Sequence, residues 1–133
     1  MRLLFTLVTA VFLGNIAAAA TVGDDGLHIQ PWIRDTFKDL QEDLDEANAE
    51  GKRLAIMFEQ RGCIYCKKMH ETVFSDPAVF SYLMDNFFVV QINMFGNVEV
   101  TDFDGETLEE RDMVSKWGYA VHANNDVFSR SCQ

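Results

Sequence analysis

The sequence predicts a single α/β domain built around a central, mostly parallel sheet. Three observations support this prediction. The 133 residues fit one domain. A composition that is 48% hydrophobic and 12% aromatic excludes a chain that is disordered throughout. Segments with helical periodicity alternate with short, continuous apolar runs, and this alternation is typical of parallel strands joined by helices.

Residues 1–20 have the pattern of a secretory signal peptide. Arg2 precedes an apolar stretch over residues 3–13, and residues 17–20 are alanines. The stretch is short for a membrane span and has no basic residue after it. We therefore expect cleavage after Ala20 and a mature protein in the bacterial periplasm, with no stable membrane association. Residues 21–30 show little periodicity and are interpreted as a leader.

The next elements form a helix, a strand and a second helix. Pro31 is expected at the first position of a helix that Gly51 ends. Its apolar stripe consists of Ile33, Phe37, Leu40, Leu44 and Ala47. The apolar run over residues 54–58 predicts a strand buried on both faces. Residues 63–74 have helical character.

The second half of the chain continues the alternation. Asp76 and Pro77 are an N-cap and a first helical residue. Residues 87–94 read as a strand, and 95–106 as a loop that turns at 104–105. A capping-box pattern over 107–110 predicts a helix that Gly118 ends, and 119–121 begin a further strand.

Charge and cysteine content narrow the function. Lys and Arg number 11 and Asp and Glu 21, so the formal charge is −10. This balance argues against nucleic acid and anionic membranes as partners. Three cysteines are too few for a disulfide-stapled scaffold, but Cys63 and Cys66 form a Cys-x-x-Cys pair.

The position of Cys63 favours redox chemistry. It falls where the predicted buried strand meets a helix, whose positive N-terminal end stabilises a thiolate. Lys67 adds positive charge nearby, and Tyr65 lies between the cysteines as a second supporting residue. We expect a lowered pKa for Cys63, which makes it the attacking thiol. Cys66, on the same helical face, can resolve the mixed disulfide.

Metal binding by the same cysteines is an alternative. Cys63, Cys66 and His70 could hold copper(I) or zinc, although a closed zinc site needs further ligands. Covalent haem attachment is excluded because Lys67, not histidine, follows the second cysteine. We expect no cofactor, and interpret His70 as a surface or boundary residue.

Residues 62–70, which follow an apolar strand, resemble the thioredoxin superfamily. Together with residues 58–60, 100–106 and 116–119, they are similar to secreted thioredoxin-like proteins of bacterial sulfur-oxidation (Sox) systems. The resemblance spans about residues 31–121. It implies a thioredoxin-like fold that exchanges thiols with protein disulfides in the periplasm. It also implies Cys63 as nucleophile, Cys66 as resolving thiol, and a membrane thiol-transfer protein as electron donor.

The chain departs from this family at two places near the cysteines. Ile64 stands where many members have proline. Met57 stands six residues before Cys63, where members often have a buried carboxylate. Glu59 could take over the proton-relay role of that carboxylate. The alternative is that Glu59 is an exposed carboxylate at the end of the strand.

The resemblance also implies that the C-terminal part is missing. A cis-proline, a hairpin and a last helix should follow residue 121 and need roughly 30 residues. Residues 122–133 are too few, and none is proline. We therefore expect a partial domain over 31–121, truncated after the third helix, and a non-native tail. Read one base later, codons for the tail can encode Thr-Pro-Thr-Met-Met-Phe, which suggests a frameshift. An inactive truncated fragment is thus a further alternative.

Overall fold

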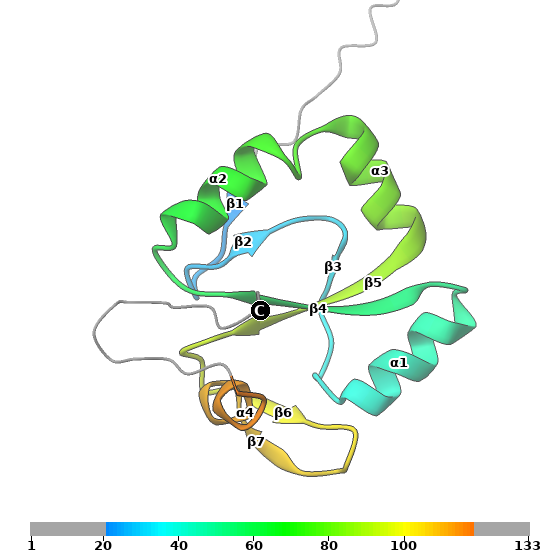
Figure 1. The fold of residues 1–133 in the computed structure, drawn as a ribbon, viewed down its shortest axis with the longest axis vertical. Helices are drawn as coiled ribbons and strands as arrows, with labels where there is room; N and C mark the ends of the chain where they lie inside the picture. Colours follow the sequence, from blue (N-terminus) through cyan, green and yellow to red (C-terminus); the bar gives the residue numbers. More distant parts are fainter. Residues whose placement is uncertain (1–20, 119–133) are drawn as a thin grey trace, which may run out of the picture.

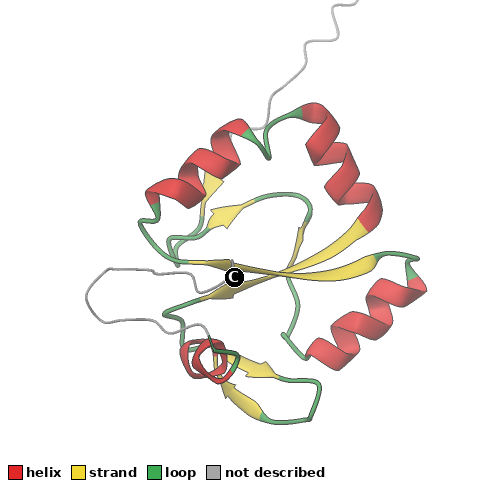
Figure 2. Ribbon diagram, viewed as in Figure 1, coloured by secondary structure: helices red, strands yellow, loops and turns green. Residues whose placement is uncertain are grey.

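The computed structural model describes residues 21–118, which form a central sheet with helices on both faces (Figures 1 and 2). The parallel strands, in the order β3-β5-β4, are β3 (Ile33–Arg34), β5 (Phe87–Asn93) and β4 (Arg53–Glu59). The helices are α1 (Leu40–Ala49), α2 (Ile64–Thr72), α3 (Pro77–Asn86) and α4 (Glu110–Lys116). In Figure 1, α2 and α3 lie above the sheet, and α1 and α4 lie below it. The predicted α/β class with a parallel sheet is therefore confirmed.

Strand β5 lies in the middle of the three strands of this sheet. Its Val89, Val90 and Ile92 are buried, and it pairs on one side with β3 and on the other with β4. The residues of β4 are mostly half-buried because β4 has a described neighbour on one side only. Burial on both faces, expected for residues 54–58, is thus a property of β5.

The main apolar core lies between the sheet and the helices on the α1 and α4 face. Its buried members are Leu40, Ile92, Val100, Met113 and Val114. A fully buried apolar side chain contributes about 1.5–3 kcal/mol. This packing fixes the strands, and α2 follows the carboxyl end of β4 (Figure 1).

The first helix begins later than the sequence pattern predicts. Asp39 caps α1 by accepting hydrogen bonds of 3.1 Å from the backbone N–H groups of Gln41 and Glu42. Ile33, expected on the helix, instead pairs with Val89 in the sheet. Phe37 is 96% exposed. The prediction of a helix from Pro31 was wrong because the apolar spacing crossed a strand and a turn.

The remaining helix and strand predictions near the site agree with the structure. Strand β4 covers the predicted run 54–58, β5 covers all but the last residue of 87–94, and α2 occupies most of residues 63–74. Asp76 caps α3 by accepting from the N–H groups of Ala78 and Val79. Pro77 then stands at the start of this helix, as predicted.

A hairpin replaces the loop expected after β5. Strand β6 (Glu99–Thr101) pairs antiparallel with β7 (Thr107–Glu109), and Gly105 turns between them with a φ of 82°. The Thr107 hydroxyl lies 2.9 Å from that of Thr101. The predicted capping box is wrong, because Thr107 belongs to a strand and α4 begins at Glu110.

The expected truncation finds no support in this region. A hairpin and a helix follow β5 within residues 21–118, where the sequence predicted a helix but no hairpin. Gly118, with a φ of 85°, follows the end of α4 as predicted. The strand expected from residue 119, the tail at 122–133 and the signal at 1–20 lie outside the described residues.

The leader at residues 21–30 is a second antiparallel hairpin. Strand β1 (Thr21–Val22) pairs with β2 (His28–Ile29). Arg61, just before the cysteine pair, donates 3.2 Å hydrogen bonds to the backbone oxygens of Asp24 and Asp25. These contacts hold the hairpin beside α2 (Figure 1). Within residues 21–118, every helix is too short or too polar to cross a membrane.

Candidate active site

The first turn of α2 carries a disulfide between Cys63 and Cys66. Their Cα atoms are 5.2 Å apart. Cys63 is the N-cap residue of the helix, and its Sγ accepts a 3.1 Å hydrogen bond from the backbone N–H of Cys66. The strand-to-helix position predicted for the pair is therefore the observed one. A sulfur at this point faces the positive end of the helix dipole.

The residues between and after the cysteines face solvent. Ile64 is 72% exposed and Tyr65 77%. Lys67 is also exposed and forms an i,i+4 ion pair with Glu71 at 3.7 Å. None of these three residues contributes to the buried interior. Their exposure leaves an apolar and cationic surface around the disulfide that another protein can contact.

An open groove of about 430 Å³ runs beside Cys63. The start of α2 and the leader hairpin form its walls, so Lys67 and Cys63 share one side of it. The lining residues are Val22, Asp24, Gly26, His28, Arg61, Gly62, Cys63, Ile64 and Lys67. The groove gives an extended chain a path to the Cys63 sulfur.

Glu59 lies at the end of β4 and is only 2% exposed. Its carboxylate accepts hydrogen bonds from His28 Nδ1 and from the side-chain amide of Gln91. His70 Nε2 is 3.5 Å from its Oε2. Burial raises the pKa of Glu59, but hydrogen bonds from His70 and His28 outweigh burial and hold the pKa below its ordinary value. An exposed strand-end carboxylate, the alternative interpretation, is therefore wrong.

His70 lies on the inner side of α2 and is 1% exposed. Its ring stacks on that of His28 at 4.4 Å between centroids, and the edge of Phe74 packs against it at 5.1 Å. The side-chain amide of Gln30 reaches its Nδ1 at 3.3 Å. The expectation of a surface or boundary histidine was wrong, because the leader hairpin covers this side of the helix.

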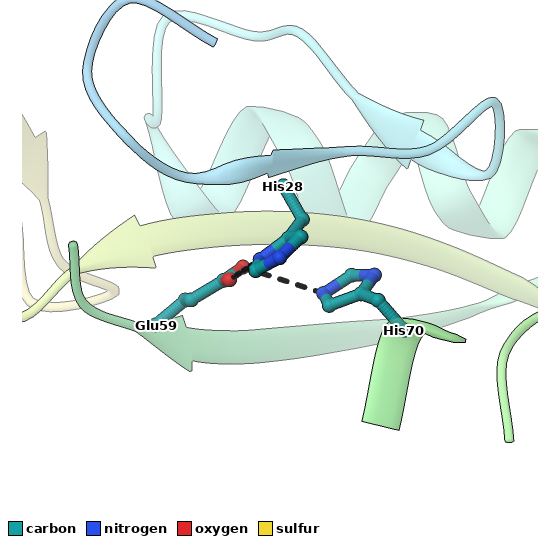
Figure 3. Close-up of side chains that lie close together, drawn as sticks. All are labelled: His28, Glu59 and His70. Carbon is teal, nitrogen blue, oxygen red and sulfur yellow. Dashed lines mark hydrogen bonds and ion pairs between the residues drawn. The ribbon is translucent and has the colours of Figure 1, made fainter. Parts of the chain in front are cut away.

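The alternative metal site of Cys63, Cys66 and His70 does not form a ligand cluster among residues 21–118. The sulfurs of Cys63 and Cys66 are bonded to each other, and the imidazole of His70 faces Glu59 instead (Figure 3). His28, which lies 31 residues before Glu59, was not predicted as a neighbour of that carboxylate. No spacing or motif in the sequence signals this contact, because only the leader hairpin creates it.

A cavity of about 190 Å³ connects the disulfide to these buried groups. Its polar lining consists of Glu59, His70 and Cys66, and the remaining lining residues are Met57, Phe58, Met69 and Phe74. Cys66 thus borders the same small space as a buried carboxylate. Met57 contributes only apolar surface at the position where a carboxylate was considered.

Comparison with known proteins identifies one match. A family model described as a thioredoxin-like domain matches residues 40–123. The matched range contains α1 to α4, the sheet strands β4 and β5, and the cysteine pair. No curated protein and no solved structure matches the chain. The comparisons therefore give the family and no particular relative, and the Sox likeness rests on the sequence motifs.

Proposed function

This chain belongs to the thioredoxin-like domain family, and we propose that it is an oxidoreductase that exchanges thiols with disulfides of other proteins. The supporting observation is the Cys63–Cys66 disulfide at the first turn of α2, with an exposed surface around it. A redox pair in this position can be oxidised and reduced without disturbing the apolar core. The groove beside Cys63 is where an extended substrate segment would lie.

The reaction runs from the reduced dithiol. The Cys63 thiolate attacks one sulfur of a substrate disulfide, and the other substrate sulfur leaves as a thiolate. Cys66 then loses its proton and attacks the Cys63 sulfur of the mixed disulfide. The substrate leaves with two thiols. The two electrons that reduced it came from the Cys63–Cys66 dithiol, which is left as a disulfide. A thiol donor must then reduce this disulfide for a second turnover.

Three local features favour the Cys63 thiolate. The sulfur accepts the backbone N–H of Cys66 at 3.1 Å, and the helix dipole adds positive potential at the same point. Lys67 lines the same groove as Cys63. Positive surroundings of this kind increase the thiolate fraction and hence the reactivity of a cysteine.

Glu59 is proposed as the proton relay for Cys66. Both residues line the 190 Å³ cavity, so a proton can pass between them without crossing the apolar core. A Glu59→Gln variant keeps the size of the side chain and removes its proton affinity. We expect it to change the pH profile of resolution and of Cys63 alkylation. An unchanged profile would exclude the relay.

The cellular setting of the proposal comes from the sequence. A cleaved signal over residues 1–20 would deliver the protein to the periplasm, where protein disulfides are the substrates. The resemblance to Sox-type thioredoxin-like proteins supports a membrane thiol-transfer protein as the electron donor. Fractionation of cells that express the full chain would locate the processed form.

Matched cysteine variants test the activity. The full chain is assayed for insulin reduction by dithiothreitol, beside Cys63→Ser, Cys66→Ser and the control Cys132→Ser. We expect Cys63→Ser to fall to the rate of dithiothreitol alone. Cys66→Ser should accumulate a mixed disulfide with the substrate, and Cys132→Ser should match the unaltered protein.

The same assay decides between the proposal and the inactive-fragment alternative. If the unaltered chain reduces insulin no faster than dithiothreitol alone, the protein is not an oxidoreductase of this type. Equal rates for Cys63→Ser and the unaltered chain would lead to the same conclusion.

A further inference from the structure

Three buried polar side chains from distant segments meet in the interior (Figure 3). His28 comes from β2, Glu59 from the end of β4, and His70 from α2. They are 8%, 2% and 1% exposed. One ligand atom of each lies within 4.8 Å of those of the other two. We refer to His28, Glu59 and His70 as the buried triad.

The buried triad presents the donor set that zinc prefers. Two imidazole nitrogens, His28 Nδ1 and His70 Nε2, face the carboxylate of Glu59. Zinc binds histidine and carboxylate donors at about 2.0–2.2 Å, so tetrahedral ligand atoms stand roughly 3.3 Å apart. The 3.5 Å between His70 Nε2 and Glu59 Oε2 is close to that spacing. An ion can therefore replace the two imidazole–carboxylate contacts with small side-chain shifts.

Further polar groups orient the triad from behind. The amide of Gln30 lies 3.3 Å from His70 Nδ1, the ring nitrogen that does not face Glu59. The amide of Gln91 donates to the Glu59 carboxylate and, at 3.2 Å, to the backbone oxygen of His28. Metal-binding histidines almost always donate their second ring N–H to an acceptor, and the Gln30 amide supplies one at Nδ1 when it is turned so that its oxygen faces the ring. The triad thus has an outer shell as well as three ligands.

The neighbouring cavity supplies room for a fourth ligand. Glu59 and His70 line a space of about 190 Å³ that is otherwise mostly apolar. This volume exceeds what one water molecule needs. Zinc sites with three protein ligands keep a water in the fourth position. The sulfur of Cys66 borders the cavity but is bonded to Cys63 in the oxidised protein.

We propose that His28, Glu59 and His70 bind a divalent transition-metal ion of the zinc type, with water as the fourth ligand. One carboxylate and two neutral imidazoles leave the bound ion with a single net positive charge. The site differs from a cysteine-based one, because both sulfurs remain in the disulfide. It does not depend on the proposed thiol exchange. The bound ion would occupy the oxygen that Glu59 otherwise offers to a proton.

Metal titration of the oxidised full chain tests this site. The protein is stripped with a chelator and titrated with Zn²⁺ by calorimetry and with Co²⁺ by visible absorption. We expect one ion per chain and a tetrahedral Co²⁺ spectrum without a thiolate charge-transfer band. The Cys63→Ser/Cys66→Ser double variant, which cannot exchange thiols, should bind within a few-fold of the unaltered protein.

Triad variants assign the ligands. Glu59→Gln and His70→Gln should each weaken Zn²⁺ binding by more than the roughly 10–100-fold that loss of an outer-shell partner costs. Gln30→Ala should fall within that range. His122→Gln, at the histidine outside the described residues, is the matched control and should bind as before. Near-UV circular dichroism without metal checks that each variant is folded.

Nitrogen NMR of the histidine rings tests the ligands in the unaltered protein, so the result does not require that any variant is folded. Zn²⁺ should shift the ring nitrogens of His28 and His70 and leave those of His122 in place. The proposal is overturned if no ion binds, if the His28 and His70 signals stay in place, or if Glu59→Gln binds as tightly as the unaltered protein. Loss of binding in the double cysteine variant would overturn it as well, since the sulfurs would then be ligands.

Discussion

The two ends of helix α2 carry polar chemistry of different origin. The first turn holds Cys63 and Cys66 three residues apart, beside side chains that face solvent. The last turn holds His70, which is buried and faces partners on two other segments. A group of functional residues within one turn can be read from consecutive letters. A group assembled by three segments exists only once the chain has folded.

We expect the largest effect on the free energy of unfolding from mutations that compare the two ends of α2. His70→Ala removes a buried ring from its stack on His28 and leaves Glu59 with one histidine fewer. We expect the free energy of unfolding to fall by about 3–5 kcal/mol, measured by urea denaturation. The control Tyr65→Ala, on the exposed end, should change it by no more than about 0.5 kcal/mol. Similar losses of unfolding free energy in the two variants would show that the buried end of α2 is no more important for stability than the exposed end.

The hairpin that brings His28 to the helix is the next target. Gly26 has a φ of 82°, and an added Cβ would lie 2.6 Å from Arg61 Nε. Gly26→Ala should therefore cost more than the about 1–2 kcal/mol of left-handed strain alone. Gly51→Ala is matched, since Gly51 has a φ of 69° and nothing within 4 Å of its added Cβ. Thermal unfolding of both variants measures the difference, and equal losses would show that the added Cβ at Gly26 meets no steric cost from Arg61.

The start of α1 sharpens the comparison between local and assembled signals. Asp39 caps this helix, whereas Pro31 lies outside it. Asp39→Ala should lower the free energy of unfolding by about 1 kcal/mol, the usual value of an N-cap. Asp35→Ala, a nearby aspartate outside the helix, serves as the control. A larger loss from Asp35→Ala would place the cap elsewhere.

The smallest effect compares two buried carboxylates. Burial raises the pKa of Asp43 and the neighbouring carboxylates add to that rise, while a hydrogen bond from Thr36 opposes it. The pKa of Glu59, in contrast, is lowered, because two histidines face that side chain. Buried carboxylates in one fold thus shift in opposite directions according to their partners.

The raised pKa of Asp43 makes the stability of the protein depend on pH. Above about pH 3.8 the unfolded chain releases this proton more readily than the folded chain, so the free energy of unfolding falls as the pH rises. Asp43→Asn should therefore raise the free energy of unfolding near neutral pH, and the gain should vanish below pH 3.8. Urea denaturation at several pH values measures it. A gain that persists unchanged in acid would point to a cause other than ionisation.

Much of the fold could be predicted because its signals are local. The strand over residues 54–58, the cap at Asp76 and the cysteine pair each depend on a few adjacent residues. The start of α1 was predicted wrongly because Ile33 and Phe37 have a helical spacing, although Ile33 lies in a strand and Phe37 is exposed. Hairpin β6–β7 was missed because its strands are only three residues long, too short for an alternation pattern.

The candidate site divides in the same way. Cys63 and Cys66 could be found from the motif and its place between strand and helix. The burial of Glu59 and His70 could not, because it depends on the leader hairpin, whose ten residues show no periodicity. His28 had no signal at all, since its contacts lie 31 and more residues away along the chain.

The leader hairpin couples the two sites. Val22 and Asp24 form part of the wall of the groove at Cys63, and His28 extends inward to Glu59. Two backbone contacts from Arg61 fasten this short segment. Any event that detaches it, such as a proteolytic cut near Gly26, would widen the entrance to the disulfide and break up the buried triad by removing His28. The ten residues of the leader hairpin therefore control access to the disulfide and the integrity of the buried triad.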